Sequence, residues 1–307
     1  MSVKQTLQVK IMEILKVNTK DGLELKGAIF GKAFHDTVVI MLSGICSNVF
    51  QNELLYSTGK LLEENGIATI IAHTRDSFSC FAYTDISTQK QKITGTFDDE
   101  FEKVYEDVDA YVQYAKNAGY KNIILAGHSL GSNKIIHYLG NTKDDCIDYF
   151  IVSSPVDIMH WWNVMPNIEM CHNMAKEWIE TGRGEDILPF LFGGFSPMKA
   201  KTVIGFFDAD NLKNCPVISK KGEIKSLYNI KPNGSFIIGS KDSVTGDSPK
   251  AFMEQINMWT KNPGKNLVIE AEGASHIFYG KHDIYAKIVL DCIKNHYQTY
   301  IKYETRL

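Results

Sequence analysis

The chain has 307 residues, of which 44% are hydrophobic and 22% are charged, as in ordinary globular proteins. Its formal net charge is −3, so it lacks the basic excess that would favour nucleic acid as a partner. No segment approaches the ~18 consecutive apolar residues that a membrane-spanning helix needs. The length allows two domains, although α/β folds of this size often form one.

Six cysteines are dispersed along the chain without a C-x-x-C pair: Cys46, Cys80, Cys146, Cys171, Cys215 and Cys292. We therefore expect reduced thiols and a cytoplasmic location. The first eight residues lack the apolar core of a signal peptide. No metal-ligand cluster and no phosphate-binding loop is visible, so no metal or cofactor is expected. Oligomeric state cannot be read from these features.

Two apolar runs at the start, 8–18 and 23–30, flank the turn sequence Thr19-Lys20-Asp21-Gly22. Asp-Gly between apolar runs is typical of a hairpin, so we expect an antiparallel pair at the edge of a sheet. A β-branched run at 37–42 predicts a buried central strand, which ends in the loop 43–47.

Strands and helices alternate along the remaining chain, apart from a polar stretch at 73–96 that we expect to be a loop. Short apolar runs predict strands at 67–72, 122–126, 148–154, 234–239 and 266–270. Helical spacing of apolar residues predicts helices at 50–62, 101–115, 133–139, 249–259 and 284–293. This alternation indicates an α/β fold with a mostly parallel central sheet and helices on both faces.

The alternation breaks between 155 and 232, where helical patterns dominate and aromatic residues are frequent. Five of the ten methionines also lie there. We interpret 155–232 as an inserted, largely helical cap on a core formed by 1–154 and 233–307. Methionines make adaptable apolar walls, so this cap could roof a site for an apolar or bulky group.

The stretch Gly127-His128-Ser129-Leu130-Gly131 joins a predicted strand to a predicted helix and has the form G-x-S-x-G. Small residues on both sides of the serine allow the strand and the helix to approach closely. The serine would then sit at the tip of a sharp turn, beside free N–H groups of the helix start. The pattern alone suits a plain strand–turn–helix corner equally well.

A serine nucleophile needs a histidine to accept its proton and an acid to orient that histidine. Asp242 and His276 each follow a predicted strand, which places them at the same sheet edge as Ser129. Asp157 and Asp247 are alternative acids. His282 is an alternative base, although its position suits a solvated turn.

These motifs resemble the α/β-hydrolase superfamily, and the resemblance covers essentially the whole chain. It implies Ser129 as nucleophile, Asp242 as acid and His276 as base. It also implies an oxyanion hole from the backbone N–H of Leu130 and one N–H from the loop after 37–42. That loop often reads His-Gly-x in the family and reads Ser43-Gly44-Ile45 here, so Ile45 is the expected donor and Cys46 the next choice.

A fainter resemblance, around Arg75-Asp76-Ser77-Phe78, the serine motif and the helical insertion, points to esterases that open fungal siderophore esters. His73 and Arg75 follow a strand at the active edge, so they could contact substrate. An ion pair of Arg75 with Asp76 or another acid that stabilises the loop is the alternative.

Three further residues are candidates for substrate binding: Cys46, Trp161 and Trp162. Cys46 could also be a small apolar filler, since its neighbours include no dedicated base. His128 is expected to pack or to form hydrogen bonds beneath the serine turn.

The sequence thus predicts a serine hydrolase that cleaves a small-molecule carboxylic ester or thioester, including one linked to a carrier or CoA. An acyltransferase or biosynthetic thioesterase with the same triad would share the acyl-enzyme. A ligand-binding protein on a hydrolase scaffold is a further alternative, because fold does not determine function.

Overall fold

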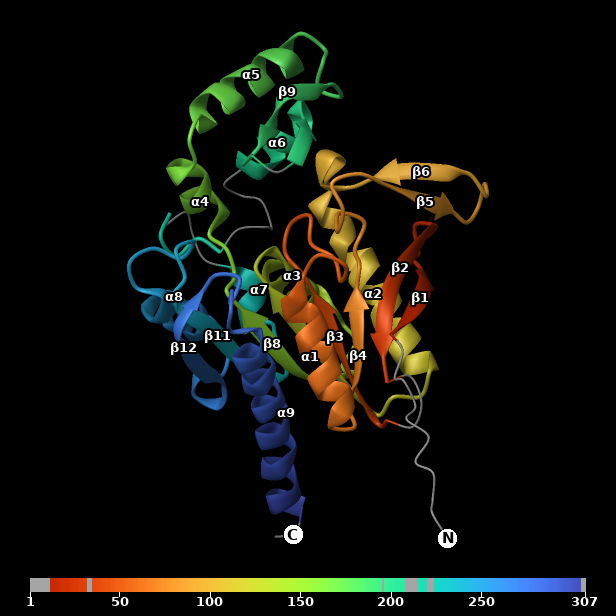
Figure 1. Cartoon of the computed structure of the whole chain (residues 1–307), viewed down its shortest axis with the longest axis vertical. Helices are drawn as coiled ribbons and strands as arrows, with labels where there is room; N and C mark the ends of the chain where they lie inside the picture. Colours follow the sequence, from red (N-terminus) through yellow and green to blue (C-terminus); the bar gives the residue numbers. More distant parts are fainter. Residues whose placement is uncertain (1–11, 32–34, 195, 208–214, 220–223, 305–307) are drawn as a thin grey trace.

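The computed structural model describes residues 12–31, 35–194, 196–207, 215–219 and 224–304. Within these residues one large sheet forms the centre of the molecule (Figure 1). Its six parallel strands, in spatial order, are β12 (Leu267–Ser275), β11 (Asn233–Lys241), β8 (Ile147–Ser153), β7 (Asn122–His128), β3 (Thr37–Leu42) and β4 (Ala68–Ala72). The chain first adds β4 on one side of β3 and then adds β7, β8, β11 and β12 on the other side. Because these connections are right-handed, the crossover helices lie on both faces of the sheet.

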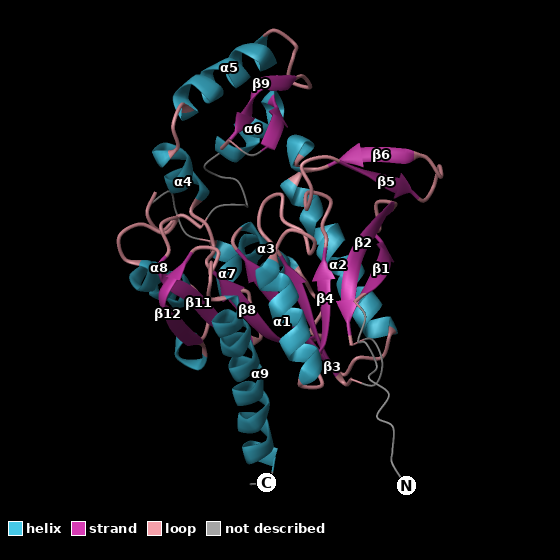
Figure 2. Ribbon diagram, viewed as in Figure 1, coloured by secondary structure: helices cyan, strands magenta, loops and turns pink. Residues whose placement is uncertain are grey.

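Alternate residues of β3 face two separate hydrophobic cores. Val38 and Ile40 belong to one core, and Val39 and Met41 to the other. The first core is covered by α2 (Val104–Asn117), α3 (Leu130–Asn141) and α8 (Pro249–Met258), and the second by α1 (Glu53–Glu64) and α9 (His282–Glu304). Figure 2 shows α1 and α9 in front of the sheet and α2 behind it. The predicted α/β architecture is therefore confirmed.

The antiparallel part of the sheet is larger than predicted. β1 (Glu13–Asn18) pairs with β2 (Leu23–Phe30) as expected, and residues 8–11 of the predicted first strand lie outside the described residues. β2 is not an edge strand, however, because it also pairs with β4 and with β5 (Phe81–Asp85). β6 (Gln91–Thr94) follows β5 as a hairpin, so the prediction of a loop across 73–96 is wrong for these residues.

Between β8 and β11 the described residues form four helices and a second hairpin: α4 (Ile158–Val164), α5 (Ile168–Glu180), β9 (Ile187–Phe192), β10 (Ser196–Lys199), α6 (Ala200–Phe207) and α7 (Lys225–Tyr228). The hairpin was not predicted. α4, α5, β9 and α6 rise above the carboxyl ends of the parallel strands, whereas α7 packs against α3 (Figure 1). Short 3-10 turns lie at Thr96–Asp98 (η1), Phe101–Lys103 (η2) and Pro263–Lys265 (η3). No helix in the described ranges is both long and apolar enough to cross a membrane.

Candidate active site

Ser129 lies at a sharp turn between β7 and α3. Its backbone has φ 55° and ψ −129°, a strained conformation for a residue with a side chain. The flanking glycines make this turn possible: a Cβ atom on Gly127 would lie 2.5 Å from the carbonyl oxygen of Gly131. A Cβ atom on Gly131 would in turn collide with the carbonyl oxygen of Leu42 on β3. The turn therefore requires glycine at both positions and leaves the serine hydroxyl at its tip.

Ser129, His276 and Asp242 form a continuous hydrogen-bonded row. The Oγ atom of Ser129 lies 2.9 Å from Nε2 of His276, and Nδ1 of His276 lies 3.0 Å from Oδ2 of Asp242. The strands that precede these residues are parallel neighbours or near neighbours in the sheet, so all three loops meet at one edge. The structure thus brings together the three residues that the sequence assigned to a triad. In this arrangement a serine hydroxyl can transfer its proton to an oriented imidazole.

Asp242 is held as a carboxylate. Burial by itself would raise its pKa, but the hydrogen bond and charge of His276 outweigh burial and lower the pKa below its ordinary value. The N–H of Val244 donates to Oδ1 over 3.0 Å and adds to this effect. An ionised Asp242 accepts from Nδ1–H of His276, which leaves Nε2 free to accept the proton of Ser129.

The alternative acids and base lie elsewhere. Asp157 is buried and accepts hydrogen bonds from the backbone N–H groups of Ile218 and Ser219. Asp247 is exposed at the surface. His282 approaches Glu53 of α1 at 3.6 Å. None of these contacts reaches Ser129.

His128 supports the loop that carries His276. Its Nε2 lies 2.7 Å from the carbonyl oxygen of His276, which can only accept, so this nitrogen carries the proton. Burial lowers the pKa of His128 to about 4 and keeps the ring neutral at physiological pH. The expected hydrogen-bonding position beneath the serine turn agrees with these contacts.

The loop after β3 lies directly against Ser129. A Cβ atom on Gly44 would be 2.9 Å from Cβ of Ser129, so only glycine permits this approach. Ile45 follows Gly44 and lines the cavity at the serine. Leu130 is the first residue of α3, so its N–H has no acceptor within the helix. Leu130 thus adjoins Ser129 in the chain, and Ile45 lines the same cavity.

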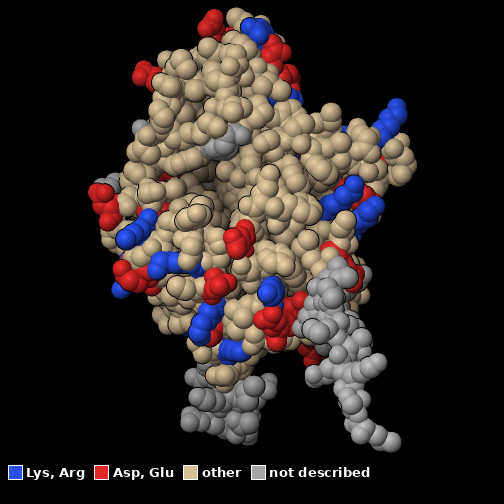
Figure 3. Space-filling model, viewed as in Figure 1, with Lys and Arg blue, Asp and Glu red and all other residues tan. Residues whose placement is uncertain are grey.

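A cavity of about 220 Å³ opens at Ser129 and His276. Apolar side chains from the core and from the segment above it line the cavity: Ile45, Leu130, Val156, Ile158, Trp161, Phe206, Val244 and Ile277. Lys, Arg, Asp and Glu are absent from its lining in the described chain. In Figure 3 this face is hollowed below the upper part of the molecule, and charged side chains are sparse around the hollow.

The other candidate binding residues are placed differently. Trp161 lines the cavity, whereas the side chain of Trp162 lies outside the described residues. Cys46 is not part of the cavity lining, because its thiol contacts the hydroxyl of Thr96 over 3.0 Å. The structure therefore places the thiol of Cys46 at Thr96 and not in the cavity lining, contrary to the expectation that Cys46 contacts substrate.

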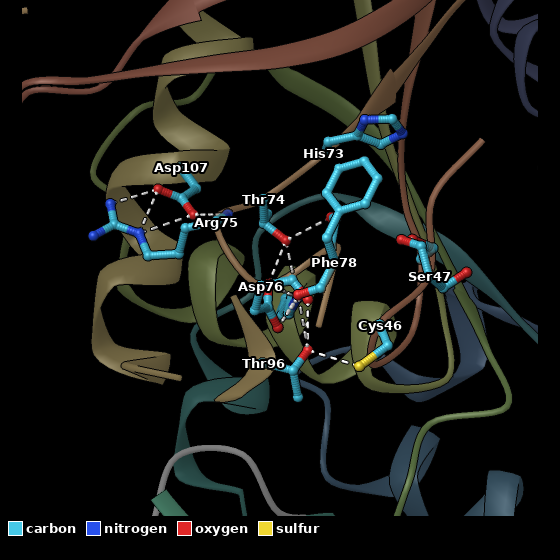
Figure 4. Close-up of polar contacts among 12 residues, drawn as sticks. Cys46, Ser47, His73, Thr74, Arg75, Asp76, Phe78, Thr96 and Asp107 are labelled. Atoms are coloured by element: carbon cyan, nitrogen blue, oxygen red, sulfur yellow. Dashed lines mark hydrogen bonds and ion pairs between the residues drawn. The ribbon is translucent and has the colours of Figure 1, made fainter. Parts of the chain in front are cut away.

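Arg75 does not reach the cavity and is nearly fully buried. Its guanidinium binds Asp107 of α2 at 2.6 Å (Figure 4). It also binds Asp21 of the first hairpin at 3.0 Å. The expected role in substrate binding is thus wrong, and the alternative of an ion pair with an acid other than Asp76 is correct. His73 accepts the N–H of Val49 over 3.0 Å, and burial lowers its pKa to about 4. His73 is therefore a loop-stabilising residue.

Asp76 forms a separate buried ion pair with Lys134 of α3, which sequence reasoning missed. Nζ of Lys134 lies 2.6 Å from both carboxylate oxygens, and both residues are at most 3% exposed. Burial would raise the pKa of Asp76, but the charge and hydrogen bonds of Lys134 lower it. A lysine among apolar residues of a helix was the available signal, because such a residue must have a buried partner.

Lys134→Met should lower the free energy of unfolding by about 3–5 kcal/mol, because it leaves the carboxylate of Asp76 buried without its counter-charge. Urea unfolding at pH 7 measures this change. In the wild type, the contribution of the pair is present above the pKa of an unfolded aspartate and is lost as the pH falls through the lower folded pKa.

The matched control is Lys116→Met, which breaks the more exposed pair with Asp144 and should cost about 1 kcal/mol or less. Equal effects of the two substitutions would contradict a special role for the buried pair.

The described residues contain no group of three or more His, Cys, Asp or Glu side chains placed to hold a metal ion. A comparison with curated protein sequences gives no significant match. Solved structures do match, at identities that show the fold alone. The esterase Pf2001 of Pyrococcus furiosus is 18% identical with a TM-score of 0.58, over 93% of this chain and 91% of that chain.

Two further structures show the same likeness. Est1E from Butyrivibrio proteoclasticus, with ferulic acid bound, is 16% identical with a TM-score of 0.58, over 91% of this chain and 99% of that chain. The α/β hydrolase GrgF from Penicillium sp. sh18 is 15% identical with a TM-score of 0.64, over 93% of this chain and 99% of that chain. The central sheet and its helices therefore have the α/β-hydrolase fold.

One family model matches residues 29–203, more than half of the chain. Its description is "Protein of unknown function (DUF1749)". The chain belongs to the DUF1749 family, and its fold is that of the α/β hydrolases.

Proposed function

We propose that this protein is a serine hydrolase that cleaves small carboxylic esters through an acyl-enzyme on Ser129. The hydrogen-bonded row from Ser129 through His276 to Asp242 carries the proposal. Ser129 attacks the carbonyl carbon while Nε2 of His276 takes its proton, and Asp242 stabilises the resulting imidazolium. His276 then gives the proton to the leaving alcohol, and a water molecule cleaves the acyl-enzyme.

The negative oxygen formed in each step would be bound by the N–H groups of Leu130 and Ile45. The close approach of Gly44 to Ser129 supports this assignment, since it places the loop that carries Ile45 against the serine. Such donors are fixed before the reaction and stabilise charge that develops only in the transition state.

The cavity supports a neutral, apolar acyl group. Its lining lacks a charged partner for a carboxylate or phosphate among the described residues. A cavity of about 220 Å³ suits a small acyl group, such as a short alkanoyl or an aryl acyl group. The esterase likenesses and the ferulic acid in one of them favour this substrate class.

We also propose that 155–232 acts as a cap, because Ile158, Trp161 and Phe206 of this segment line the cavity together with core residues. The stretch Arg75-Asp76-Ser77-Phe78, which suggested siderophore esters, is mostly buried and serves the structure. It therefore adds no support for that substrate. All six cysteines are free thiols, which favours a reducing compartment such as the cytoplasm.

The proposal is tested with p-nitrophenyl esters from acetate to dodecanoate and with a fluorophosphonate probe. We expect saturable hydrolysis of the short esters, and peptide mapping should find the phosphonyl group on Ser129. Thioesters of the same acyl groups would show whether the site accepts sulfur leaving groups. A properly folded protein that neither reacts with the probe nor turns over any ester would overturn the proposal in favour of a binding protein.

Trp161→Ala should shift the acyl preference towards longer chains, because it enlarges the cavity beside Ser129. We expect the ratio of kcat/KM for octanoate over butyrate to rise by about 10-fold, the effect of one or more methylene groups in an apolar pocket. Trp178→Ala is the matched control: Trp178 lies on α5 and packs on Arg183 at 3.8 Å, outside the cavity lining. An equal shift in both variants would argue against a direct contact of Trp161 with the acyl group.

A further inference from the structure

The loop that carries Ile45 has an unusual backbone at the next residue. Cys46 has φ 52°, a left-handed conformation that residues with a Cβ atom rarely adopt. The N–H of Ser47 closes the turn by donating to the carbonyl oxygen of Gly44 over 3.3 Å. Ile45 and Cys46 are the two central residues of this turn, so a contact that holds Cys46 also restricts the position of Ile45.

The thiol of Cys46 is held by Thr96, which is 50 residues away in the chain and fully buried. The Thr96 hydroxyl donates to the carbonyl oxygen of Asp76 over 2.8 Å, so its lone pairs are left to accept the thiol proton over 3.0 Å. Figure 4 shows Thr96 between Cys46 and the stretch that carries Asp76. The hydroxyl of Ser79 approaches the same sulfur at 3.5 Å.

Thr96 itself is fixed by a close packing of two segments. A Cβ atom on the preceding Gly95 would lie 2.5 Å from the carbonyl oxygen of Ser79, so a larger residue would push the segments apart. The N–H of Thr96 also donates to the carbonyl oxygen of Phe78 over 2.9 Å. These contacts leave the Thr96 hydroxyl little freedom to follow Cys46 if the loop moves.

The same row of contacts reaches the helix that begins after Ser129. The side chain of Asp76 binds Lys134 of α3, and its carbonyl oxygen accepts from Thr96. A buried path therefore runs from Lys134 through Asp76 and Thr96 to Cys46. It joins α3, which begins at Leu130, to the turn that contains Ile45.

We propose that Thr96 is a positioning residue for the oxyanion site: its hydroxyl holds Cys46 and thereby fixes the turn 44–47, which carries Ile45, against Ser129. This inference rests on the proposed ester hydrolysis. Thr96 touches no substrate, so its removal should affect the charged transition state rather than the binding of the neutral ester.

Thr96→Val tests the proposal, because it removes the hydroxyl and keeps the branched shape. We expect kcat per fluorophosphonate-titrated site to fall by about 10-fold, with KM changed less than about 2-fold, since complete loss of one oxyanion donor costs about 10²–10³-fold. Binding of a trifluoromethyl ketone, which forms a tetrahedral adduct with serine, should weaken by a similar factor. Thr96→Ser keeps the hydroxyl and should restore most of both quantities.

Thr58→Val is the matched control. Thr58 is also fully buried, and its hydroxyl donates to the carbonyl oxygen of Leu54 within α1. This variant should keep wild-type kcat and ketone affinity even where its urea midpoint falls. A Thr96→Val enzyme that loses stability but keeps both kinetic quantities would overturn the proposal and leave Thr96 with a structural role only.

A double-mutant cycle with Cys46→Ala separates one shared contact from two independent effects. If Thr96 acts through Cys46, the double variant should be no slower than the slower single variant. Multiplied effects would overturn the proposal. Failure of the proposed function has a different signature, since the wild-type enzyme would then lack both ester turnover and labelling of Ser129.

Discussion

Ser129→Ala is expected to lower kcat/KM for every hydrolysed ester by about 10⁴-fold or more, as removal of a triad nucleophile does. The hydroxyl lies 2.9 Å from its base and is the only group at the tip of the strained turn that can form the acyl-enzyme. Alanine fits this backbone without the hydroxyl, so the fold should remain. The loss should appear in kcat, measured with p-nitrophenyl butyrate under saturating conditions.

Two controls make the result specific. Ser87→Ala removes an exposed hydroxyl that binds Asp85 in the turn between β5 and β6, far from the cavity lining, and should leave the rate unchanged. Urea unfolding should show that Ser129→Ala is folded. Near wild-type turnover by Ser129→Ala would refute an acyl-enzyme on Ser129 and would mean that a different residue is the nucleophile.

Five of the six parallel strands were predictable because they are buried on both faces. The residues of β3 all have apolar side chains after Thr37, since they alternate between two cores. A continuous β-branched run is the direct consequence of this double burial. The same reasoning located β4, β7, β8 and β11.

The hairpin at β5–β6 escaped prediction for the opposite reason. Three of the four residues of β6 are exposed and only Ile93 is apolar, so no apolar run marks the strand. β5 forms where it can pair with Leu23 and Glu24 of β2, far away in the chain. Pairing with a distant strand is a tertiary effect that local patterns do not record.

The triad was predictable from order and position, because each residue follows a strand whose carboxyl end must reach the same edge of the sheet. The contacts of the residues around the triad were not predictable. Arg75 finds Asp107 and Asp21 at separations of 32 and 54 residues, and nothing in its local sequence distinguishes these acids from Asp76. The contact of Cys46 with Thr96 likewise depends on how two loops pack.

Several of these contacts are joined through Arg75 and Asp76. Arg75 binds Asp107, and Asp76 binds Lys134 and accepts from Thr96, which contacts Cys46. Buried charges on Asp76 and Lys134 cost desolvation unless they are paired, so their partners must stay in place. A rigid support of this kind suits a site in which small displacements of a hydrogen-bond donor reduce the rate strongly. The buried network therefore connects the stability of the fold to the geometry expected of the site.

Asp242→Asn should lower kcat by about 10³–10⁴-fold while the fold is retained, because the amide changes the proton arrangement of His276. In the wild type, Asp242 accepts the Nδ1 proton of His276 over 3.0 Å. The NH₂ group of the substituted amide side chain could donate to Nδ1 instead, which would place the imidazole proton on Nε2. That nitrogen could then no longer accept the proton of Ser129.

Asp247→Asn and Asp157→Asn decide between the three acids that the sequence left open. Asp247 is exposed, so its substitution should leave kcat within about 2-fold of wild type. Asp157→Asn leaves one acceptor oxygen for the N–H groups of His160, Ile218 and Ser219, so it should act on stability rather than on the pH dependence of kcat. Because His276 lowers the pKa of Asp242, the stabilisation from this pair is present at neutral pH and is lost as the pH falls through the folded pKa. Asp242→Asn should remove that acid-dependent loss of stability, and a variant at 157 or 247 that alone abolished turnover would reassign the acid.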